Sequence, residues 1–363
     1  MATTTPPGTM ERILRLMSDK KASDVYLSAH SPALIKINGL CIPINNQVLP
    51  PDAPRNLLAE VIPADRMAEL ERIGELNMGF PIPGVGRFRV SAMRQRGSIA
   101  AVIRYIAVEV PALGNLGLPA VLGELIMQKR GLLLMVGATG SGKSTTLASM
   151  IDSRNEVLAG HILTIEDPIE FTYRNNKSII HQRELNEDTR SFSNALRAAL
   201  REDPDVILVG ELRDLETIQL AVTAAETGHL VFATLHTSSA SQTVDRMVDV
   251  FPAEQQTQIR VQLSGSLLAV FSQTLCKSAE PTSSGAFGRV MAQEIMINTP
   301  AIANLIREGK SSQLYSQIQT GASMGMQTLE RALANLVEDG KVTRDEALLK
   351  TTKPEELVRL LDR

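Results

Sequence analysis

The sequence predicts an α/β protein of two domains, a small one at the amino end and a larger one with a parallel sheet. Short alternating apolar segments run as far as residue 106. Residues 107–119 then carry two Pro and two Gly, which is typical of a linker. Beyond them, apolar strands alternate with helices, the pattern of parallel strands joined by crossovers. We therefore expect domains at 1–106 and 120–363.

The composition limits the class of protein. The 363 residues suffice for two or three domains. There is no Trp, with only four Tyr and eight Phe, so a stacking surface for single-stranded nucleic acid is not expected. The net charge of −3 and the absence of a long basic run also argue against nucleic acid as a partner.

The cysteines and the apolar runs indicate the compartment. Cys41 and Cys276 lie far apart in sequence, which fits a reducing cytosol and excludes a four-cysteine zinc site within this chain. Every apolar run is far shorter than the ~18 residues that span a membrane. The amino end lacks the charged and apolar regions of a signal peptide. We therefore expect a cytoplasmic protein without a transmembrane segment.

In the first domain the apolar residues recur with the spacing of a helix in some segments and of a strand in others. Residues 9–20 place Met10, Leu14 and Met17 on one helical face. Two alternating segments that end at Asn38-Gly39 predict strands and a hairpin. After a polar tail at 1–8, the expected elements are a helix at 9–20, strands at 25–27 and 33–37, two helices across 52–73 and two strands across 86–106.

The second domain is organised around residues 131–145. Five consecutive apolar residues, 132–136, predict a buried strand, and the next eight fit the phosphate-binding pattern G-x-x-x-x-G-K-[ST]. Its glycines let backbone N–H groups turn inward on a phosphate, Lys143 can reach the β- and γ-phosphates, and Ser144 can ligate Mg²⁺. The expected binding residues for ATP and Mg²⁺ are Gly137, Ala138, Thr139, Gly140, Ser141, Gly142, Lys143, Ser144 and Thr145.

Further strands of the same sheet are expected at 161–166, 205–210 and 230–235, with helices between them. This order predicts a nucleotide-binding core of the RecA type that extends to about residue 276. The remainder, 288–363, begins with a strand and continues mostly as helices, from about 297.

Acidic residues follow two of these strands, where ligands of open α/β sheets bind. Glu166, Asp167 and Glu170 stand at the first exit, and three carboxylates there favour a site for Mg²⁺ and water over a solvated acidic turn. Glu211 follows the apolar run 206–209, the Walker B arrangement. Gly210 stands where many such proteins carry Asp, so Glu211 is expected to hold Mg²⁺ directly or through water.

Histidines and arginines supply further candidates. His236 lies at the carboxyl end of its predicted strand, whereas His229 lies at the opposite end. Arg197 and Arg201 lie four apart on a predicted helix at 192–201, and they are equally well explained as an exposed stripe paired with Glu202 and Asp203.

In the first domain, Arg104 stands alone in an apolar segment. A guanidinium buried there needs an anionic partner, for which a γ-phosphate of a neighbouring subunit is one candidate. The flanking arginines of this region, Arg87, Arg94 and Arg96, are expected to lie in solvent.

With these residues in view, the chain resembles the secretion ATPase superfamily, and within it the type IV pilus retraction ATPases of the PilT/PilU family. The resemblance covers nearly the whole chain. It is carried by 23–25, 86–90, the loop at 137–144, 164–170, 201–211, 226–229 with 236–237, and 324–329.

The resemblance implies a small PAS-like N-terminal domain and a RecA-like ATPase domain, assembled as a homo-hexamer with ATP at the subunit interfaces. It implies Glu170 as general base and Glu211 on the Mg²⁺ side. Arg89 and Arg104 would reach the phosphates when the ring closes. Arg197, Arg201 and the His-box member His229 would lie near the site. The implied partners are an inner-membrane pilus platform protein and a paralogous pilus ATPase, at the inner face of the cytoplasmic membrane.

One position departs from the family pattern. The retraction motif Ala-Ile-Arg-Asn-Leu-Ile-Arg-Glu reads here, at 301–308, with Ala303 in place of the first Arg. The hydrolytic residues are unaffected, but an accessory role becomes an alternative to a complete retraction motor.

Two further alternatives belong to other classes. A pilus assembly or type II secretion ATPase usually carries a four-cysteine zinc insert, which Cys276 alone cannot build. A regulatory subunit that binds nucleotide without hydrolysis would be expected to have lost Lys143, Glu170 or Glu211, and all three are present.

Overall fold

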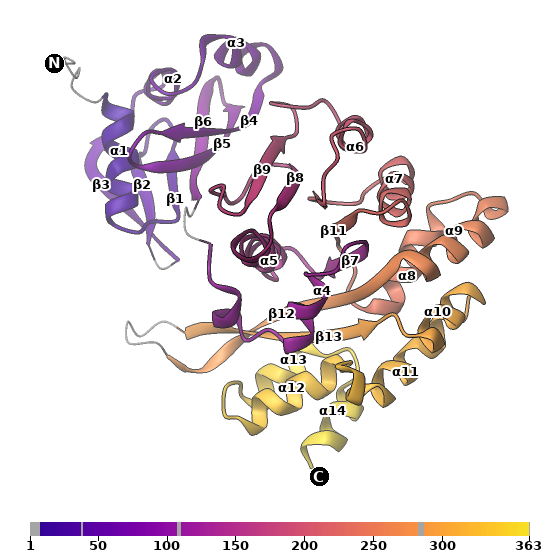
Figure 1. Cartoon of the computed structure of the whole chain (residues 1–363). Coiled ribbons are helices and arrows are strands. Elements are labelled where there is room, and N and C mark those ends of the chain that lie inside the picture. Colours follow the sequence, from indigo (N-terminus) through magenta and orange to yellow (C-terminus); the bar gives the residue numbers. More distant parts are fainter. Residues whose placement is uncertain (1–7, 38, 107–109, 282–286, 363) are drawn as a thin grey trace. The chain divides into compact units, whose positions relative to one another are not determined.

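The computed structural model describes residues 8–37, 39–106, 110–281 and 287–362, in two compact units, Met1–Glu109 and Val110–Arg363 (Figure 1). Within the predicted linker, residues 107–109 lie outside the described residues, as do residues 1–7 of the predicted tail. Residues 110–119 belong to the second unit and include the short 3-10 helix η1 (Leu113–Leu116).

The first unit is a six-stranded antiparallel sheet in the order β3-β2-β1-β6-β5-β4. Its described elements are α1 (Thr9–Asp19), β1 (Asp24–Leu27), β2 (Pro32–Ile37), β3 (Leu40–Val48), α2 (Ala53–Ala59), α3 (Ala64–Ile73), β4 (Glu75–Ile82), β5 (Gly86–Gln95) and β6 (Ser98–Ile106).

One face of this sheet forms the core of the unit. Phe88, Val90 and Ala92 alternate along β5 and are buried, since side chains two residues apart share a face. They pair with β6 and belong to one cluster with Met10, Leu14 and Met17 of α1. The predicted helix, the strands at 25–27 and 33–37, the helix pair and the strand pair are thus confirmed. The hairpin was predicted at residues 38–39, and residue 38 lies outside the described residues. The strands β3 and β4 were not predicted.

The second unit is built on a seven-stranded sheet in the order β13-β12-β7-β11-β10-β8-β9. The described strands are β7 (Gly131–Val136), β8 (Gly160–Glu166), β9 (Ser178–Glu184), β10 (Val206–Val209), β11 (Leu230–Leu235), β12 (Leu267–Pro281) and β13 (Phe287–Ile297). The α-helices are α4 (Ala120–Leu125), α5 (Lys143–Val157), α6 (Phe192–Ala199), α7 (Leu215–Glu226), α8 (Ala240–Asp249), α9 (Ala253–Ser266), α10 (Pro300–Arg307), α11 (Leu314–Thr320), α12 (Leu329–Glu338), α13 (Arg344–Lys350) and α14 (Pro354–Leu361).

The register gathers four loops at one edge of this sheet. Adjacent strands from β12 to β9 pair in parallel, and only β13 runs antiparallel in the described sheet. Val136, the last residue of β7, pairs with Leu235, and Val209 pairs with both Ala233 and Ile165. The segments that follow β7, β8, β10 and β11 therefore leave the sheet side by side, as the sequence predicted.

The central strand is buried on both faces. Leu132, Leu134 and Val136 belong to one core cluster, and Leu133 and Met135 belong to another on the opposite face. This explains why the strand reads as a continuous apolar run. Among the described residues, no helix has both the length and the apolar character needed to cross a bilayer.

One predicted boundary and one strand differ from the structure. The helix expected at 192–201 ends at Ala199, so Arg201 lies in the turn after α6. The strand β9, which pairs with β8 at the edge of the sheet, was not predicted.

Candidate functional site

The phosphate-binding loop joins β7 to α5 as predicted. Its glycines adopt positive φ angles, 143° at Gly137, 79° at Gly140 and 90° at Gly142. L-residues rarely adopt such angles, and glycine does so without steric penalty. Lys143 and Ser144 open α5, whose amino end directs its dipole and its free N–H groups toward the loop. The loop therefore has the backbone shape of an anion-binding site.

Lys143 is the buried cation of this loop. It is 8% exposed, and its Nζ donates to the carbonyl oxygens of Gly137 at 2.7 Å and Ala138 at 3.1 Å. Burial lowers the pKa of Lys143, and the negative charges of Glu211 and Glu170 oppose this shift. The charges of both predicted acids therefore act on the predicted lysine.

The three carboxylates predicted at the exit of β8 do not form one site. Glu166 is buried, and its Oε1 accepts hydrogen bonds from Thr164 Oγ1 at 2.7 Å and Gln182 Nε2 at 3.3 Å. Burial raises the pKa of Glu166 to about 7. Asp167 and Glu170 are exposed. The expectation that all three share a metal was wrong for Glu166, because its side chain points into the interior.

Glu211 lies among charged partners at the end of β10. Its Oε2 accepts from Arg213 Nη2 at 2.7 Å, and its Oε1 lies 3.4 Å from His236 Nε2. Burial alone would raise the pKa of Glu211, but the hydrogen bond and charge of Arg213, together with His236, lower it overall. Asp167 lies 4.0 Å from Arg213 Nη1. Glu211 is therefore held ionised at the end of β10, and His236, directly after β11, lies against it.

Arg213 was missed by sequence reasoning. It stands two residues after Glu211 and contacts the acids that follow β8 and β10. Its charge could have been noted from the sequence, but the approach to Asp167 depends on the pairing of β8 with β10.

The described residues contain no cluster of three or more His, Cys, Asp or Glu side chains that could hold a metal ion. Mg²⁺ in nucleotide sites typically keeps several waters and binds through one or two protein ligands plus phosphate. The hydroxyl of Ser144, half-exposed in the first turn of α5, and the ionised carboxylate of Glu211 fit that requirement.

His229 lies at the other end of β11 from the loop. Its backbone carbonyl accepts from Gly131 N, at the start of β7, at 3.0 Å, and its Nδ1 lies 3.1 Å from Ala224 O. Within one chain the strand β11 therefore separates His229 from the phosphate-binding edge.

The two arginines of the α6 region have different surroundings. Arg197 forms an ion pair with Glu216 of α7, and both side chains are about half exposed. Its partner is thus neither Glu202 nor Asp203. Arg201 is exposed in the turn after the helix.

Arg104 has an anionic partner within its own unit, whereas the sequence had suggested a γ-phosphate of a neighbouring subunit as one candidate. Its Nε donates to Asp24 Oδ1 at 2.8 Å across the β1–β6 pair, and the Asp24 carboxylate is almost fully buried. The Arg104 side chain is 65% exposed, so it lies on the outer face of the sheet, not in the core. Arg89 is directly opposite Arg104 on β5.

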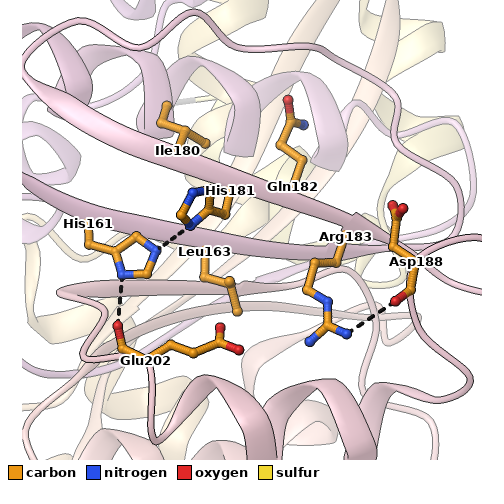
Figure 2. A pocket seen from close by; sticks show the side chains of 8 residues that line it. All are labelled: His161, Leu163, Ile180, His181, Gln182, Arg183, Asp188 and Glu202. Atoms are coloured by element: carbon orange, nitrogen blue, oxygen red, sulfur yellow. Dashed lines mark hydrogen bonds between the residues drawn. The ribbon is translucent and has the colours of Figure 1, made fainter.

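A separate pocket of about 670 Å³ lies along the edge strand β9 (Figure 2). His161 Nε2 lies 3.0 Å from His181 Nδ1, and His161 Nδ1 lies 3.1 Å from the carbonyl oxygen of Glu202. Because a carbonyl can only accept, His161 Nδ1 carries a proton. The pocket is lined by His161, Leu163, Ile180, His181, Gln182, Arg183, Asp188 and Glu202. His161 stands near the start of β8, so this pocket is distinct from the acids at its end.

Comparisons with known proteins identify the family. Residues 74–349 match the family model described as type II/IV secretion system protein. The chain belongs to this family. The type IV pilus retraction ATPase PilT of Pseudomonas aeruginosa is 50% identical over 94% of this chain and 98% of its own length. The type IV pilus ATPase PilU of the same organism is 41% identical over 93% and 87%.

A solved structure supports the same conclusion. The crystal structure of the pilus retraction motor PilT with bound ADP matches with a TM-score of 0.89 and 45% identity, over 98% of this chain and all of that one. The predicted fold class, a small α/β domain followed by a P-loop ATPase domain, is confirmed. So are the membership in the PilT/PilU group and the enzyme class, a nucleotide-binding ATPase.

Proposed function

We propose that this chain is a motor that hydrolyses ATP to drive the retraction and disassembly of a type IV pilus. The observation that carries the proposal is the loop at 137–144 with Lys143 in the field of Glu170 and Glu211, in a chain 50% identical to PilT. A regulatory subunit that only binds nucleotide would have no use for this set of acids beside an intact loop lysine.

Different residues of the site bind the phosphates, bind Mg²⁺ and activate water. The backbone N–H groups of the loop and Lys143 bind the phosphates, and Ser144 and Glu211 hold Mg²⁺, which supplies charge for the transferring phosphoryl group. Glu170, which is exposed and whose charge acts on Lys143, accepts the proton of the attacking water. Glu211 is better suited to bind Mg²⁺ than to act as the general base, because Arg213 and His236 lower its pKa.

The family resemblance supports a homo-hexamer in which residues of one subunit serve the nucleotide of the next. In this proposal Arg89 and Arg104 approach the phosphates of a neighbouring subunit. The same arrangement would give His229, which β11 separates from the phosphate-binding loop of its own chain, access to a neighbouring site, and Arg197 and Arg201 would lie near the site. The ring works in the cytoplasm, at the inner face of the cytoplasmic membrane, with a pilus platform protein and a paralogous ATPase as partners.

Ala303 is the position that raises the alternative of an accessory motor. It is half-buried on α10, at the position where the retraction motif carries Arg. The identity of 50% to PilT against 41% to PilU favours the complete motor.

The deciding experiment is a pilus retraction assay in a strain that lacks its own retraction ATPases. We expect this chain alone to restore retraction. Retraction that appears only with a second pilus ATPase would assign the accessory role. Increased piliation without any retraction, with ATP hydrolysis intact, would favour an assembly motor.

A further inference from the structure

The phosphate-binding loop rests on a glutamine of the neighbouring strand. Gln273 follows Ser272 of β12, which pairs with Val136 at the end of β7, and it is 3% exposed. Its Nε2 donates to the carbonyl oxygen of Ser141 at 2.7 Å. Its Oε1 accepts from Thr146 Oγ1 of α5 at 3.1 Å. One side chain therefore ties the loop to the first turn of the helix that follows it.

The partners fix the orientation of this carboxamide. A carbonyl oxygen can only accept, so the Gln273 atom that faces Ser141 must be the nitrogen. Oε1 then takes a second hydrogen bond, at 3.1 Å, from Nε2 of Gln293, which is itself buried on β13. If the carboxamide were rotated by half a turn, Gln273 Oε1 would face the carbonyl oxygen of Ser141 and Gln273 Nε2 would face Nε2 of Gln293. Buried groups left unpaired in this way are strongly unfavourable.

Two glycines of the loop lie directly on Gln273. A Cβ atom at Gly137 would come within 2.3 Å of the carbonyl oxygen of Gln273, and one at Gly142 within 2.8 Å of its Nε2. Such distances leave no room for a side chain. The backbone of the loop and the surface of β12 are therefore complementary, and a shift of Gln273 must move the loop.

The hydrogen bonds of Gln273 and Gln293 continue to residues 324–329, which have no role in the proposed nucleotide chemistry. Gln327 Nε2 donates to the backbone carbonyl of Gln293 at 2.9 Å, and the backbone of Gln327 pairs with Ile295 of β13. Gln327 belongs to residues 324–329, one of the motifs on which the family resemblance rests. Three glutamines thus connect this motif with the phosphate-binding loop.

We propose that Gln273 is a positioning residue for ATP hydrolysis, whose carboxamide, oriented by Gln293, holds the Ser141–Gly142 part of the loop in the shape that receives the phosphates. The inference rests on the proposed nucleotide site. Backbone N–H groups bind an anion only in the direction that the loop sets for them. Loss of Gln273 therefore weakens phosphate binding without removing any group that touches the nucleotide.

The test compares two variants that each lose a buried carboxamide. Gln273→Met keeps the approximate volume of the side chain and removes its polar atoms. We expect it to raise the KM for ATP and the Kd for ADP by about 10-fold or more, since misplaced binding groups act less well on the substrate. Asn298→Leu is the matched control. Asn298 Nδ2 donates to the carbonyl oxygens of Ser264 and Leu267, at the end of β12 opposite the loop.

Similar melting temperatures for the two variants, with the loss of affinity confined to Gln273→Met, would support the proposal. Wild-type KM, Kd and kcat in folded Gln273→Met would overturn it. If that variant does not fold, Gln293→Leu decides, because it leaves Gln273 in place but removes one of the two donors to its Oε1. A raised KM for ATP is then expected, and an unchanged KM rejects the positioning role.

Lys143→Ala separates this inference from the proposed site. If it binds ADP as the wild type does, the nucleotide site itself is wrong. If Lys143→Ala loses ADP while Gln273→Met keeps wild-type affinity, only the positioning role fails.

Discussion

Two glutamates four positions apart, Glu166 and Glu170, have opposite surroundings, and this decides their roles. Glu166 is buried and accepts hydrogen bonds from Thr164 and Gln182, and burial raises its pKa to about 7. Glu170 is exposed, and its charge acts on Lys143. A base must reach the attacking water, so geometry favours Glu170, and Glu166 serves the structure around it.

Substitution of Glu170 should separate catalysis from binding. A base acts on the water and not on the bound ground state, so Glu170→Gln should keep ATP affinity within a few-fold and reduce turnover by roughly 10²-fold or more. Nucleotide titration and steady-state ATPase assays measure the two quantities. Lys143→Ala is the contrast, because it should weaken binding itself. Equal losses of binding and turnover in Glu170→Gln would remove Glu170 from the role of base.

Glu166 should make the stability of the protein depend on pH. Since the folded state keeps this proton to about pH 7 and the unfolded chain loses it near 4.5, stability falls as pH rises through this window. Above pH 7 the raised pKa of Glu166 lowers the free energy of unfolding by about 3 kcal/mol. Glu166→Gln mimics the protonated form, because its Oε1 can accept the same hydrogen bonds from Thr164 and Gln182.

Thermal melts of nucleotide-free protein test this. Wild type and Glu166→Gln should melt at similar temperatures at pH 4.5, and the variant should melt higher at pH 8. A difference between them that does not change with pH would show that folding does not raise the pKa of Glu166.

At the scale of elements, the sequence predicted the strands and helices whose apolar pattern is strong. The strand, loop and helix from Gly131 to Val157 were found because a doubly buried strand reads as an unbroken apolar run. The strand β4 was missed because it contains Gly79 and Pro81, which are tolerated at a sheet edge. Two further edge strands, β3 and β9, were missed because they carry polar residues, which an edge strand tolerates since one of its sides has no neighbouring strand.

Long-range contacts lay beyond sequence reasoning. Asp24 and Arg104 are eighty positions apart, and only the register of β1 with β6 makes them partners. Likewise Gln273 meets Ser141 because β12 inserts beside β7, although β12 comes last among the parallel strands in the chain. The candidate residues could be listed from the sequence, but their partners depend on strand order.

The contact between the loop and β12 predicts unequal roles for the loop glycines. Gly137→Ala would place a Cβ atom 2.3 Å from the Gln273 carbonyl at a φ of 143°, whereas a Cβ at Gly140 meets no atom within 4 Å. We expect Gly137→Ala to abolish ADP binding and lower the melting temperature. Gly140→Ala should lower the free energy of unfolding by only about 1 kcal/mol, the cost of a positive φ at an L-residue. Isothermal titration with ADP and thermal melts measure both effects, and equal behaviour of the variants would contradict the clash.

At the scale of the whole molecule, the chain consists of two units with separate cores. The core cluster around Phe88 and Ile103 lies entirely in the first unit, and the clusters on the two faces of β7 lie in the second. The phosphate-binding loop belongs to the second unit. Any contribution of Arg104 to hydrolysis therefore comes from the unit that has no such loop, and the proposed ring assigns that contribution to a neighbouring subunit.

Mixed rings test this assignment. An arginine directed at the γ-phosphate can contribute about 10³-fold or more to turnover. Neither Arg104→Ala nor Lys143→Ala should then hydrolyse ATP well alone. Mixed in one ring, the two variants should regain activity, because some interfaces pair an intact loop with an intact arginine. ATPase assays across mixing ratios, with co-assembly verified by mass analysis of tagged subunits, provide the measurement.

The ion pair with Asp24 sets the control for this experiment. Arg104→Ala leaves a buried carboxylate without its charged partner, with Ser23 Oγ still donating to it at 2.8 Å, so the variant could lose activity through its fold alone. The double variant Asp24→Asn/Arg104→Ala removes that charge, and it should be equally inactive alone and equally rescued by Lys143→Ala. Activity restored by the double variant without mixing would show that the unpaired Asp24, and not a missing contact to phosphate, caused the defect. Verified mixed rings that gain nothing at any ratio would leave Arg104 with a structural role, as the partner of Asp24 within its own subunit.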